Sequence, residues 1–280
     1  MKNIKNQVIL ITGSTDGLGK GTATALASMG ATILLHGRDK AKLEITSKEI
    51  KKASRNDRIK TYLGDYSSLA EVRRLAAEIQ ETNDNLDVLI NNVGIGTGSP
   101  KTIYQRELSK DGFELRFSVN YLAHFLLTNL LVPSLRQSAP SRIVNIASVG
   151  QDTIDFSNVM LDKGYNGTLA YRQSKTAIIM FTFDLAERLK KDNITVNCLH
   201  PATYMNTKMV REDIGKGIQS IQNGVNAVIY LATSSELNGV TGKYFDQKQE
   251  SRAIQQAYDL SSRKELRLLS ENLTRVKLAS

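Results

Sequence analysis

The chain has 280 residues, of which 41% are apolar, and this is enough for one α/β domain with a large core. Its one cysteine, Cys198, excludes an internal disulfide and suits a reducing compartment. The net charge of +9 comes from basic residues spread among acidic ones, without interleaved aromatic residues, so we expect no nucleic-acid binding. The histidines and the cysteine lack the spacing of metal ligands, so we expect no metal site.

The chain shows no targeting or membrane segment that we recognise. The apolar run in MKNIKNQVILITG is too short for a signal peptide. No stretch approaches the ~20 apolar residues that a membrane-spanning helix needs. We therefore expect a protein without a membrane span, located in the cytoplasm.

The first elements predict a unit that binds a dinucleotide. The apolar run QVILITG predicts a buried strand, TGSTDGLG a glycine-rich turn, and KGTATALASM a helix that ends near Gly30. Glycines in the turn let a pyrophosphate approach the backbone, and the helix N-terminus offers free N–H groups to that anion. The residues of this turn that we expect to contact the cofactor are Gly13, Ser14, Thr15, Gly17, Leu18 and Gly19.

The second predicted strand, ATILLHGRD, bears on the choice of cofactor. The end of this strand meets the adenosine ribose in such folds, where an acidic residue favours NAD. Here Arg38 follows Gly37, and a guanidinium can bind a 2′-phosphate through two parallel hydrogen bonds. We therefore favour NADP(H). NAD(H) stays open, because Arg38 could be a solvated charge and Asp39 could turn towards the ribose.

Polar residues follow the third and fourth predicted strands. Asp65 and Tyr66 come after IKTYLG, and Asp65 could accept from an adenine amino group or cap the next helix. Asn92 and Gly94 end the strand LDVLINNVG. Ligands of open parallel sheets bind at the carboxyl ends of the strands, so we assign these four residues to the cofactor site.

The second half of the chain continues the alternation of helices and strands. DGFELRFSVNYLAHFLLTNLLVPSL predicts a long helix in which Asn120 is either a satisfied core amide or a site group. SRIVNIAS predicts a fifth strand that ends at Ser148, ITVNCLH a sixth strand before Pro201, and VTGKYF a seventh. We expect residues 203–220 to form a substrate flap and 246–280 a C-terminal helical extension of one domain, 1–280.

The motif YRQSK places Tyr171 and Lys175 at the start of a predicted helix. Residues four positions apart lie on one face of a helix, so both side chains can enter one site. A nearby ammonium stabilises a phenolate and lowers the pKa of the phenol. Tyr171 is therefore a candidate general acid and base, although a surface pair would have the same spacing.

Taken in order, these motifs resemble those of the short-chain dehydrogenases/reductases. The matching segments are TGSTDGLG, NNVG, FSVN, IVNIAS, YRQSK and the HP that follows ITVNCL. NYLAHFLLTNLL, LAYRQSK and the 23 positions between Ser148 and Tyr171 resemble the retinol dehydrogenase-like branch. The resemblance implies a single-domain Rossmann fold, with helices on both faces of a doubly wound, seven-stranded parallel sheet of order 3-2-1-4-5-6-7.

The resemblance also implies an activity and a role for each catalytic residue. The activity is hydride transfer between NAD(P)(H) and a small-molecule carbonyl or alcohol, here of medium size and largely apolar. Tyr171 would transfer the proton, Lys175 would lower the pKa of Tyr171 and bind the nicotinamide ribose, Ser148 would polarise the carbonyl, and Asn120 would hold a water. A homodimer through two long helices is also compatible with the resemblance.

The segment after the sixth strand departs from the family pattern. Pro201-Ala202 stands where the family has Pro-Gly, and Asn206 stands where the family has a threonine that contacts the nicotinamide. Either Thr207 makes that contact after a one-residue insertion or Asn206 replaces it. Pro201, Thr203 and Thr207 are the residues of this segment that we assign to the cofactor site.

Two other functions remain as alternatives. One is a regulator that binds NADP(H) without turnover. The other is an NADPH-dependent reductase of carbon–carbon double bonds, as among relatives of protochlorophyllide reductase.

Overall fold

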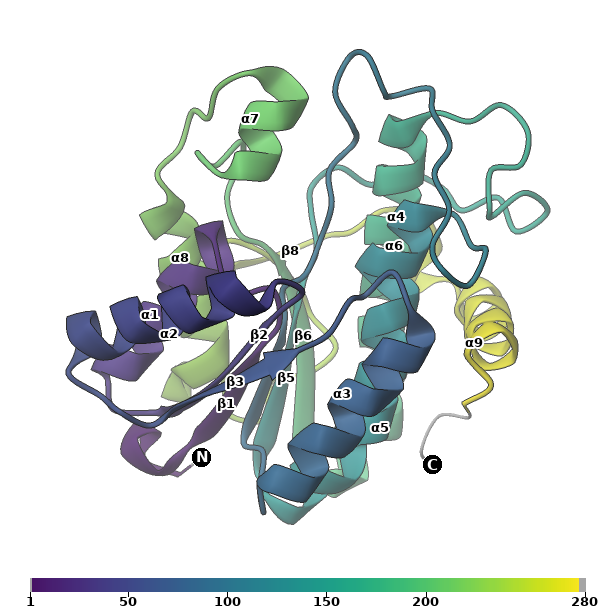
Figure 1. Ribbon diagram of the computed structural model, residues 1–280. Helices are drawn as coiled ribbons and strands as arrows, with labels where there is room; N and C mark the ends of the chain where they lie inside the picture. Colours follow the sequence, from purple (N-terminus) through teal and green to yellow (C-terminus); the bar gives the residue numbers. More distant parts are fainter. Residues whose placement is uncertain (1, 277–280) are drawn as a thin grey trace.

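A computed structural model describes residues 2–276, and a twisted eight-stranded sheet runs through its centre (Figure 1). The strand order is β3-β2-β1-β4-β5-β6-β7-β8. Neighbours from β3 to β7 pair in parallel, whereas β8 pairs antiparallel with β7. The strands are β1 (Val8–Ile11), β2 (Thr32–Gly37), β3 (Ile59–Leu63), β4 (Val88–Asn91), β5 (Ser141–Ile146), β6 (Ile194–His200), β7 (Tyr244–Asp246) and β8 (Gln249–Ser251).

The predicted order of the seven parallel strands is confirmed, and the eighth strand is an addition to it. β8 lies in the segment 246–280, for which the sequence predicts a helical extension. Its residues are polar and exposed, so they carry no alternation of apolar and polar positions that would indicate a strand. β7 turns back through Gln247, whose φ of +56° lies in the left-handed region that tight turns use.

Helices cover both faces of the sheet (Figure 1). α1, α2 and α8 pack on one face, and α3, α5 and α6 pack on the other. The longer helices are α1 (Gly17–Ser28), α2 (Lys40–Ser54), α3 (Leu69–Thr82), α5 (Ala123–Gln137), α6 (Gly167–Arg188), α8 (Ile221–Thr233) and α9 (Leu260–Thr274). The short ones are α4 (Leu115–Phe117), α7 (Lys208–Ile214), η1 (Ile4–Asn6), η3 (Lys190–Asp192), η4 (Ser235–Leu237) and η5 (Gln255–Tyr258).

The long helix that the sequence predicts around Asn120 contains a wide turn. α4 passes into a π-helical turn, η2 (Ser118–Leu122), and then into α5. Single π-helical turns of this kind are frequent at functional sites. Asn120 lies at the centre of η2, where the wider turn displaces its position from that of a regular α-helix.

The C-terminal segment packs outside the second layer of helices. η5 and α9 lie against α6, so α6 is covered by α9 on the side away from the sheet (Figure 1). The described part of this extension is thus a strand, a 3-10 turn and a helix; residues 277–280 lie outside the described residues. Among the helices of residues 2–276, none has the length and apolar character needed to cross a membrane.

Candidate active site

The glycine-rich turn joins β1 to α1 at the carboxyl edge of the sheet. Gly13 and Gly17 have φ values of +63° and +52°, which side chains disfavour. A Cβ on Gly19 would lie 2.3 Å from the carbonyl oxygen of Gly13, so the helix can approach the turn only without a side chain there. The turn therefore leaves its backbone and the N-terminus of α1 open to a phosphate group.

The hydroxyl of Thr12 ties this turn to the end of β4. Its Oγ1 accepts from the backbone N–H groups of Asn92 at 2.8 Å and Val93 at 3.1 Å. In return, Nδ2 of Asn92 donates to the carbonyl oxygens of Thr12 at 2.8 Å and Gly13 at 3.0 Å. The side chain of Asn92 is thus used to hold the glycine turn in place.

His36 supports the same turn, and sequence reasoning missed it. The N–H of Gly13 donates to Nδ1 of His36 at 3.1 Å, and Nε2 lies 3.1 Å from the carbonyl oxygen of Gly64. Because Nδ1 accepts, we assign the proton to Nε2. Burial lowers the pKa of His36 to about 4, which keeps the ring neutral. The available signal was a lone polar ring near the end of the apolar strand ATILLHG.

The residues expected near the adenosine take different positions. Arg38 is exposed after β2, whereas Asp39 caps α2 by accepting from the N–H of Lys42 at 3.1 Å. Asp65 accepts from the N–H of Ser67 at 3.0 Å and pairs with Lys110 at 3.0 Å.

Local polar partners also determine the pKa of the Asp65 carboxyl. Burial raises its pKa, but the hydrogen bonds from Ser67 and Lys110 outweigh burial and leave the pKa below its usual value. The ring of Tyr66 is buried between those of His36 and His124. The main chain of Tyr66 is therefore the part that could meet an adenine.

The catalytic candidates converge at the same edge of the sheet. Tyr171 and Lys175 lie one turn apart on α6, and Ser148 follows β5. Nζ of Lys175 lies 5.5 Å from the centroid of the Tyr171 ring and donates to the carbonyl oxygen of Ile146 at 3.0 Å. Ser148 and Tyr171 face the same point, because a Cβ on Gly150 would lie 3.4 Å from Oγ of Ser148 and 3.7 Å from Cε1 of Tyr171.

Burial controls the protonation of this pair. It raises the pKa of Tyr171 more than the nearby hydroxyl of Ser148 lowers it, and the carboxylate of Asp213 raises it further. Burial also lowers the pKa of Lys175 to about 8. The expectation that Lys175 lowers the pKa of Tyr171 stays a prediction. Tyr171 is a phenol at neutral pH and has a proton to donate.

Asn120 and Gly94 complete the group around Lys175. Oδ1 of Asn120 accepts from the N–H of Ile95 at 2.8 Å, and Nδ2 donates to the carbonyl oxygen of Ile95 and to Oγ of Ser174, both at 3.1 Å. A Cβ on Gly94 would lie 3.5 Å from Oδ1 of Asn120 and 3.6 Å from Nζ of Lys175. The water-holding role implied for Asn120 stays a prediction.

The expected flap contains α7 and lies against the glycine turn. Cγ2 of Thr207 is 3.4 Å from where a Cβ on Gly17 would stand, and the Thr207 hydroxyl caps α7. Oδ1 of Asn206 instead accepts from Arg211 at 3.0 Å. Of the two alternatives, Thr207 is the one that faces the turn.

Pro201 and Thr203 lead from β6 into this flap. Pro201 is buried, with its Cβ 3.4 Å from where a Cβ on Gly224 would stand. Thr203 is exposed; its hydroxyl lies 3.0 Å from Nε2 of His200, and its N–H donates to Oε1 of Gln219 at 3.1 Å. Both residues thus anchor the start of the flap through contacts within the protein.

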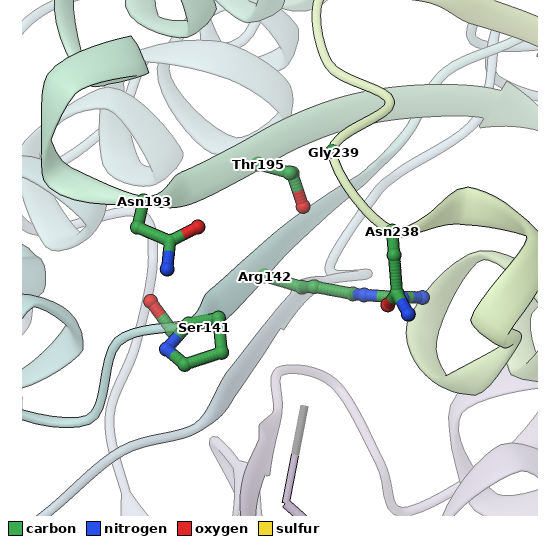
Figure 2. Close-up of a pocket in the computed structure, with 7 residues that line it drawn as sticks. Ser141, Arg142, Asn193, Thr195, Asn238 and Gly239 are labelled. Carbon is green, nitrogen blue, oxygen red and sulfur yellow. The ribbon is translucent and has the colours of Figure 1, made fainter.

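A cavity of about 250 Å³ lies at the opposite edge of the sheet, beside the first residues of β5 and β6 (Figure 2). Arg142 reaches across it and donates to Oδ1 of Asn238 at 2.8 Å. The same guanidinium donates to the carbonyl oxygens of Leu231 and Ser234 at the end of α8. Arg142 therefore caps a helix C-terminus, far from the catalytic candidates.

Comparisons with known proteins agree with this architecture. The family described as short chain dehydrogenase matches residues 7–217. Human retinol dehydrogenase 13 is 36% identical, covering 91% of this chain and 81% of its own. Human retinol dehydrogenase 14 is 35% identical, covering 95% of this chain and 85% of its own.

Solved structures share the fold. An uncharacterized protein from Mycobacterium Paratuberculosis has a TM-score of 0.78 at 26% identity, covering 98% of this chain and 96% of its own. A short chain dehydrogenase from Escherichia coli CFT073, complexed with NADPH, has a TM-score of 0.71 at 25% identity, covering 87% and 97%.

The doubly wound sheet and the residues at its carboxyl edge define a Rossmann-fold oxidoreductase. The chain belongs to the short chain dehydrogenase family. The family inferred from the motifs, with its retinol dehydrogenase-like branch, is thereby confirmed.

Proposed function

We propose that the protein is an NADP(H)-dependent oxidoreductase that interconverts a carbonyl and an alcohol, with Tyr171 as general acid and base. The observation that carries this proposal is the convergence of Tyr171, Ser148 and Lys175 beside a glycine turn that can accept a pyrophosphate. The retinol dehydrogenases among its relatives support a carbonyl and alcohol pair as substrate and product.

The protein's own residues would act on the substrate oxygen. When bound, the cofactor supplies the hydride in reduction and accepts it in oxidation. As the carbonyl carbon gains the hydride, the phenol of Tyr171 gives its proton to the oxygen; in oxidation the phenolate takes that proton back. Ser148 orients the oxygen towards Tyr171. Lys175 is cationic below its pKa of about 8 and stabilises the phenolate that proton transfer leaves.

Three observations support NADP(H) as the cofactor. The turn that would receive the pyrophosphate can close only around a glycine at position 19, where a Cβ would lie 2.3 Å from the carbonyl oxygen of Gly13. Within residues 2–276, Arg38 has no hydrogen bond or ion pair that would compete with a 2′-phosphate. Asp39 is directed towards the first turn of α2, so its carboxylate is engaged there. We assign Thr207 to the nicotinamide end, because it is the flap residue opposite Gly17.

The substrate that we propose is of medium size and largely apolar. Val149, next to Ser148, is 51% exposed, and Tyr204 and Ile218 on the flap are 50% and 73% exposed. Tyr204 and Ile218 are neighbours, because the N–H of Ile218 donates to the carbonyl oxygen of Tyr204 at 2.7 Å. Exposed apolar side chains beside a site favour an apolar ligand.

Replacing Tyr171 tests the proposal. With NADPH and a panel of apolar aldehydes and ketones, we expect Tyr171→Phe to lower kcat about 10²- to 10⁴-fold, the usual contribution of a general acid. NADPH binding and the circular dichroism spectrum should not change. Tyr104→Phe is the matched control, because Tyr104 is 73% exposed and lies outside the site. Full activity of Tyr171→Phe would reject the proposal.

Product analysis separates this proposal from its alternatives. An alcohol product supports carbonyl reduction, and a saturated carbon–carbon bond would identify a double-bond reductase. Tight NADPH binding without turnover across the panel would identify a regulator. A cytoplasmic location and a homodimer stay predictions, to be measured by fractionation and by light scattering.

A further inference from the structure

One peptide group beside the catalytic residues is held from both sides. It joins Gly96 to Thr97 in the loop after β4. Its carbonyl oxygen accepts from Nε of Arg116 at 2.8 Å, and its N–H donates to Oδ2 of Asp213 at 2.9 Å. Arg116 belongs to α4 and Asp213 to α7 in the flap. The peptide group thus connects the body of the protein to the flap.

Arg116 is held by contacts that do not involve the flap. It is 3% exposed, and its Nη1 donates to the hydroxyl of Tyr165 at 2.6 Å and lies 3.8 Å from Oε1 of Glu114. Tyr165 donates to Oε1 of Glu114 at 3.2 Å, and Oε2 accepts from the N–H of Phe117 at 2.6 Å. The buried network sets the direction of the guanidinium, and therefore of the peptide group that it holds. A donor on the carbonyl side also polarises the peptide and strengthens its N–H as a donor.

The loop has space for the carboxylate only because residue 96 is glycine. A Cβ on Gly96 would lie 2.1 Å from Oδ2 of Asp213, well inside van der Waals contact. On the other side, the carbonyl oxygen of Thr97 lies 2.1 Å from where a Cβ on Gly167 would stand. Gly167 is the first residue of α6, the helix that carries Tyr171. The loop is thus packed between the flap and the catalytic helix.

The contact places α7 directly over the catalytic group. Cε of Met209 lies 3.8 Å from the point where a Cβ on Gly94 would stand. The same point is 3.6 Å from Nζ of Lys175 and 3.5 Å from Oδ1 of Asn120. One turn along α7, the carboxylate of Asp213 is close enough to Tyr171 to raise its pKa. The flap observed here is therefore a closed one.

We propose that Asp213 is a positioning residue that latches the flap over the active site, by accepting the N–H of Thr97 from a peptide group that Arg116 has already oriented. The latched flap retains the substrate and excludes water during hydride transfer. This role rests on the proposed function. The neighbouring Glu212 lacks this geometry, because its side chain is 63% exposed and pairs with Lys208 at 3.6 Å within α7.

Three variants separate the latch from a general effect of charge on α7. Asp213→Ala removes the acceptor, Asp213→Asn keeps an acceptor oxygen without the charge, and Glu212→Ala removes a neighbouring charge only. Hydrogen exchange at the Thr97 amide reports the latch without any substrate. We expect Asp213→Ala to exchange about tenfold faster or more, the size expected for a lost charge-assisted hydrogen bond. Asp213→Asn should lie between Asp213→Ala and the unchanged protein, and Glu212→Ala should not differ from the latter.

Steady-state kinetics give the second readout. In Asp213→Ala, we expect KM for the carbonyl substrate to rise about tenfold, with a smaller change in kcat. Gly96→Ala should reproduce both effects from the other side of the contact, because its methyl group displaces the carboxylate. If both changes break the same contact, the double variant is no worse than either single one.

The possible results test the latch and the proposed oxidoreductase function separately. Unchanged Thr97 exchange and unchanged KM in a folded Asp213→Ala variant would overturn the latch, as would an equal effect of Glu212→Ala. Faster Thr97 exchange in Asp213→Ala, in a protein that reduces no carbonyl, would support the latch and reject the proposed function.

Discussion

At the scale of single residues, Arg38 sets the cofactor preference that we propose. It is exposed at the end of β2, and its charge is available to a 2′-phosphate. We expect Arg38→Ala to raise the Kd for NADPH about tenfold or more and to leave the Kd for NADH unchanged, because only NADPH carries that phosphate. Titration calorimetry at fixed salt measures both values.

A variant on the helix that follows Arg38 controls for the loss of one positive charge. Lys52→Ala removes an exposed charge near the other end of α2, so it should leave both Kd values unchanged. Equal weakening of NADPH and NADH binding in Arg38→Ala would show that Arg38 contacts a part common to both cofactors. Tighter NADH than NADPH binding by the unchanged protein would contradict the preference itself.

Residue types alone identified the candidates that lie near one another along the chain. The glycine turn and the Tyr171–Lys175 pair carry their geometry in their spacing, since a turn or a helix fixes it locally. The contacts of His36 with Gly13, and of Asp213 with Thr97, join segments 23 and 116 positions apart. No local rule brings such residues together, so these two contacts became visible only in the folded structure.

At the scale of elements, β1 to β7 could be predicted from the local sequence, whereas β8 could not. Buried parallel strands read as apolar runs, and their order follows from the right-handed crossovers between them. β8 is polar, exposed and three residues long, so it is defined by its pairing with β7 and by no pattern of its own. The π-helical turn η2 also has no sequence pattern that we recognise, apart from a polar Asn120 in an apolar stretch.

The docking of α9 onto η2 yields a prediction about stability. The hydroxyl of Tyr121 lies 2.6 Å from Oγ of Ser270, and both side chains are buried. Ser270 donates to the carbonyl oxygen of Leu266, so Tyr121 is the donor in this pair. We expect Tyr121→Phe to lower the free energy of unfolding by about 1 kcal/mol, and Ser270→Ala by about 1–3 kcal/mol, because the latter leaves a buried hydroxyl unpaired.

A double-mutant cycle by urea unfolding isolates the interaction. The double variant should lose less than the sum of the two single losses, since either change already breaks the bond. Strict additivity would show that the hydroxyl groups do not couple. Ser261→Ala, on the exposed first turn of α9, is the control and should change the free energy of unfolding little.

At the scale of the whole molecule, two buried histidines hold the loops at the carboxyl edge of the sheet. His36 contacts the turn and the loop after β3. His124 on α5 lies 2.8 Å, through Nε2, from the carbonyl oxygen of Val93 after β4. Tyr66 packs between the two rings. Burial lowers the pKa of His36 to about 4 and that of His124 to about 3, so the folded protein holds both neutral.

This arrangement makes the fold sensitive to acid. In the unfolded chain both histidines titrate near ~6.5, so below that pH the unfolded state binds more protons than the folded state. The stability that depends on neutral His36 and His124 is therefore complete above pH ~6.5. It decreases as the pH falls towards about 4 for His36 and about 3 for His124. Each histidine contributes a slope of up to ~1.4 kcal/mol per pH unit in that window.

One substitution separates the contribution of His124 from that of the carboxyl groups. His124→Gln keeps an N–H donor for the carbonyl oxygen of Val93 but cannot be protonated. Between pH 6 and 4.5, the free energy of unfolding of the variant should therefore fall less steeply, by ~1.4 kcal/mol per pH unit. Urea unfolding at closely spaced pH values measures this difference, and the titration of acidic residues common to both proteins cancels from it. Parallel pH profiles would mean that His124 binds a proton in the folded protein, and hence that water reaches the ring behind Val93 and the cofactor turn.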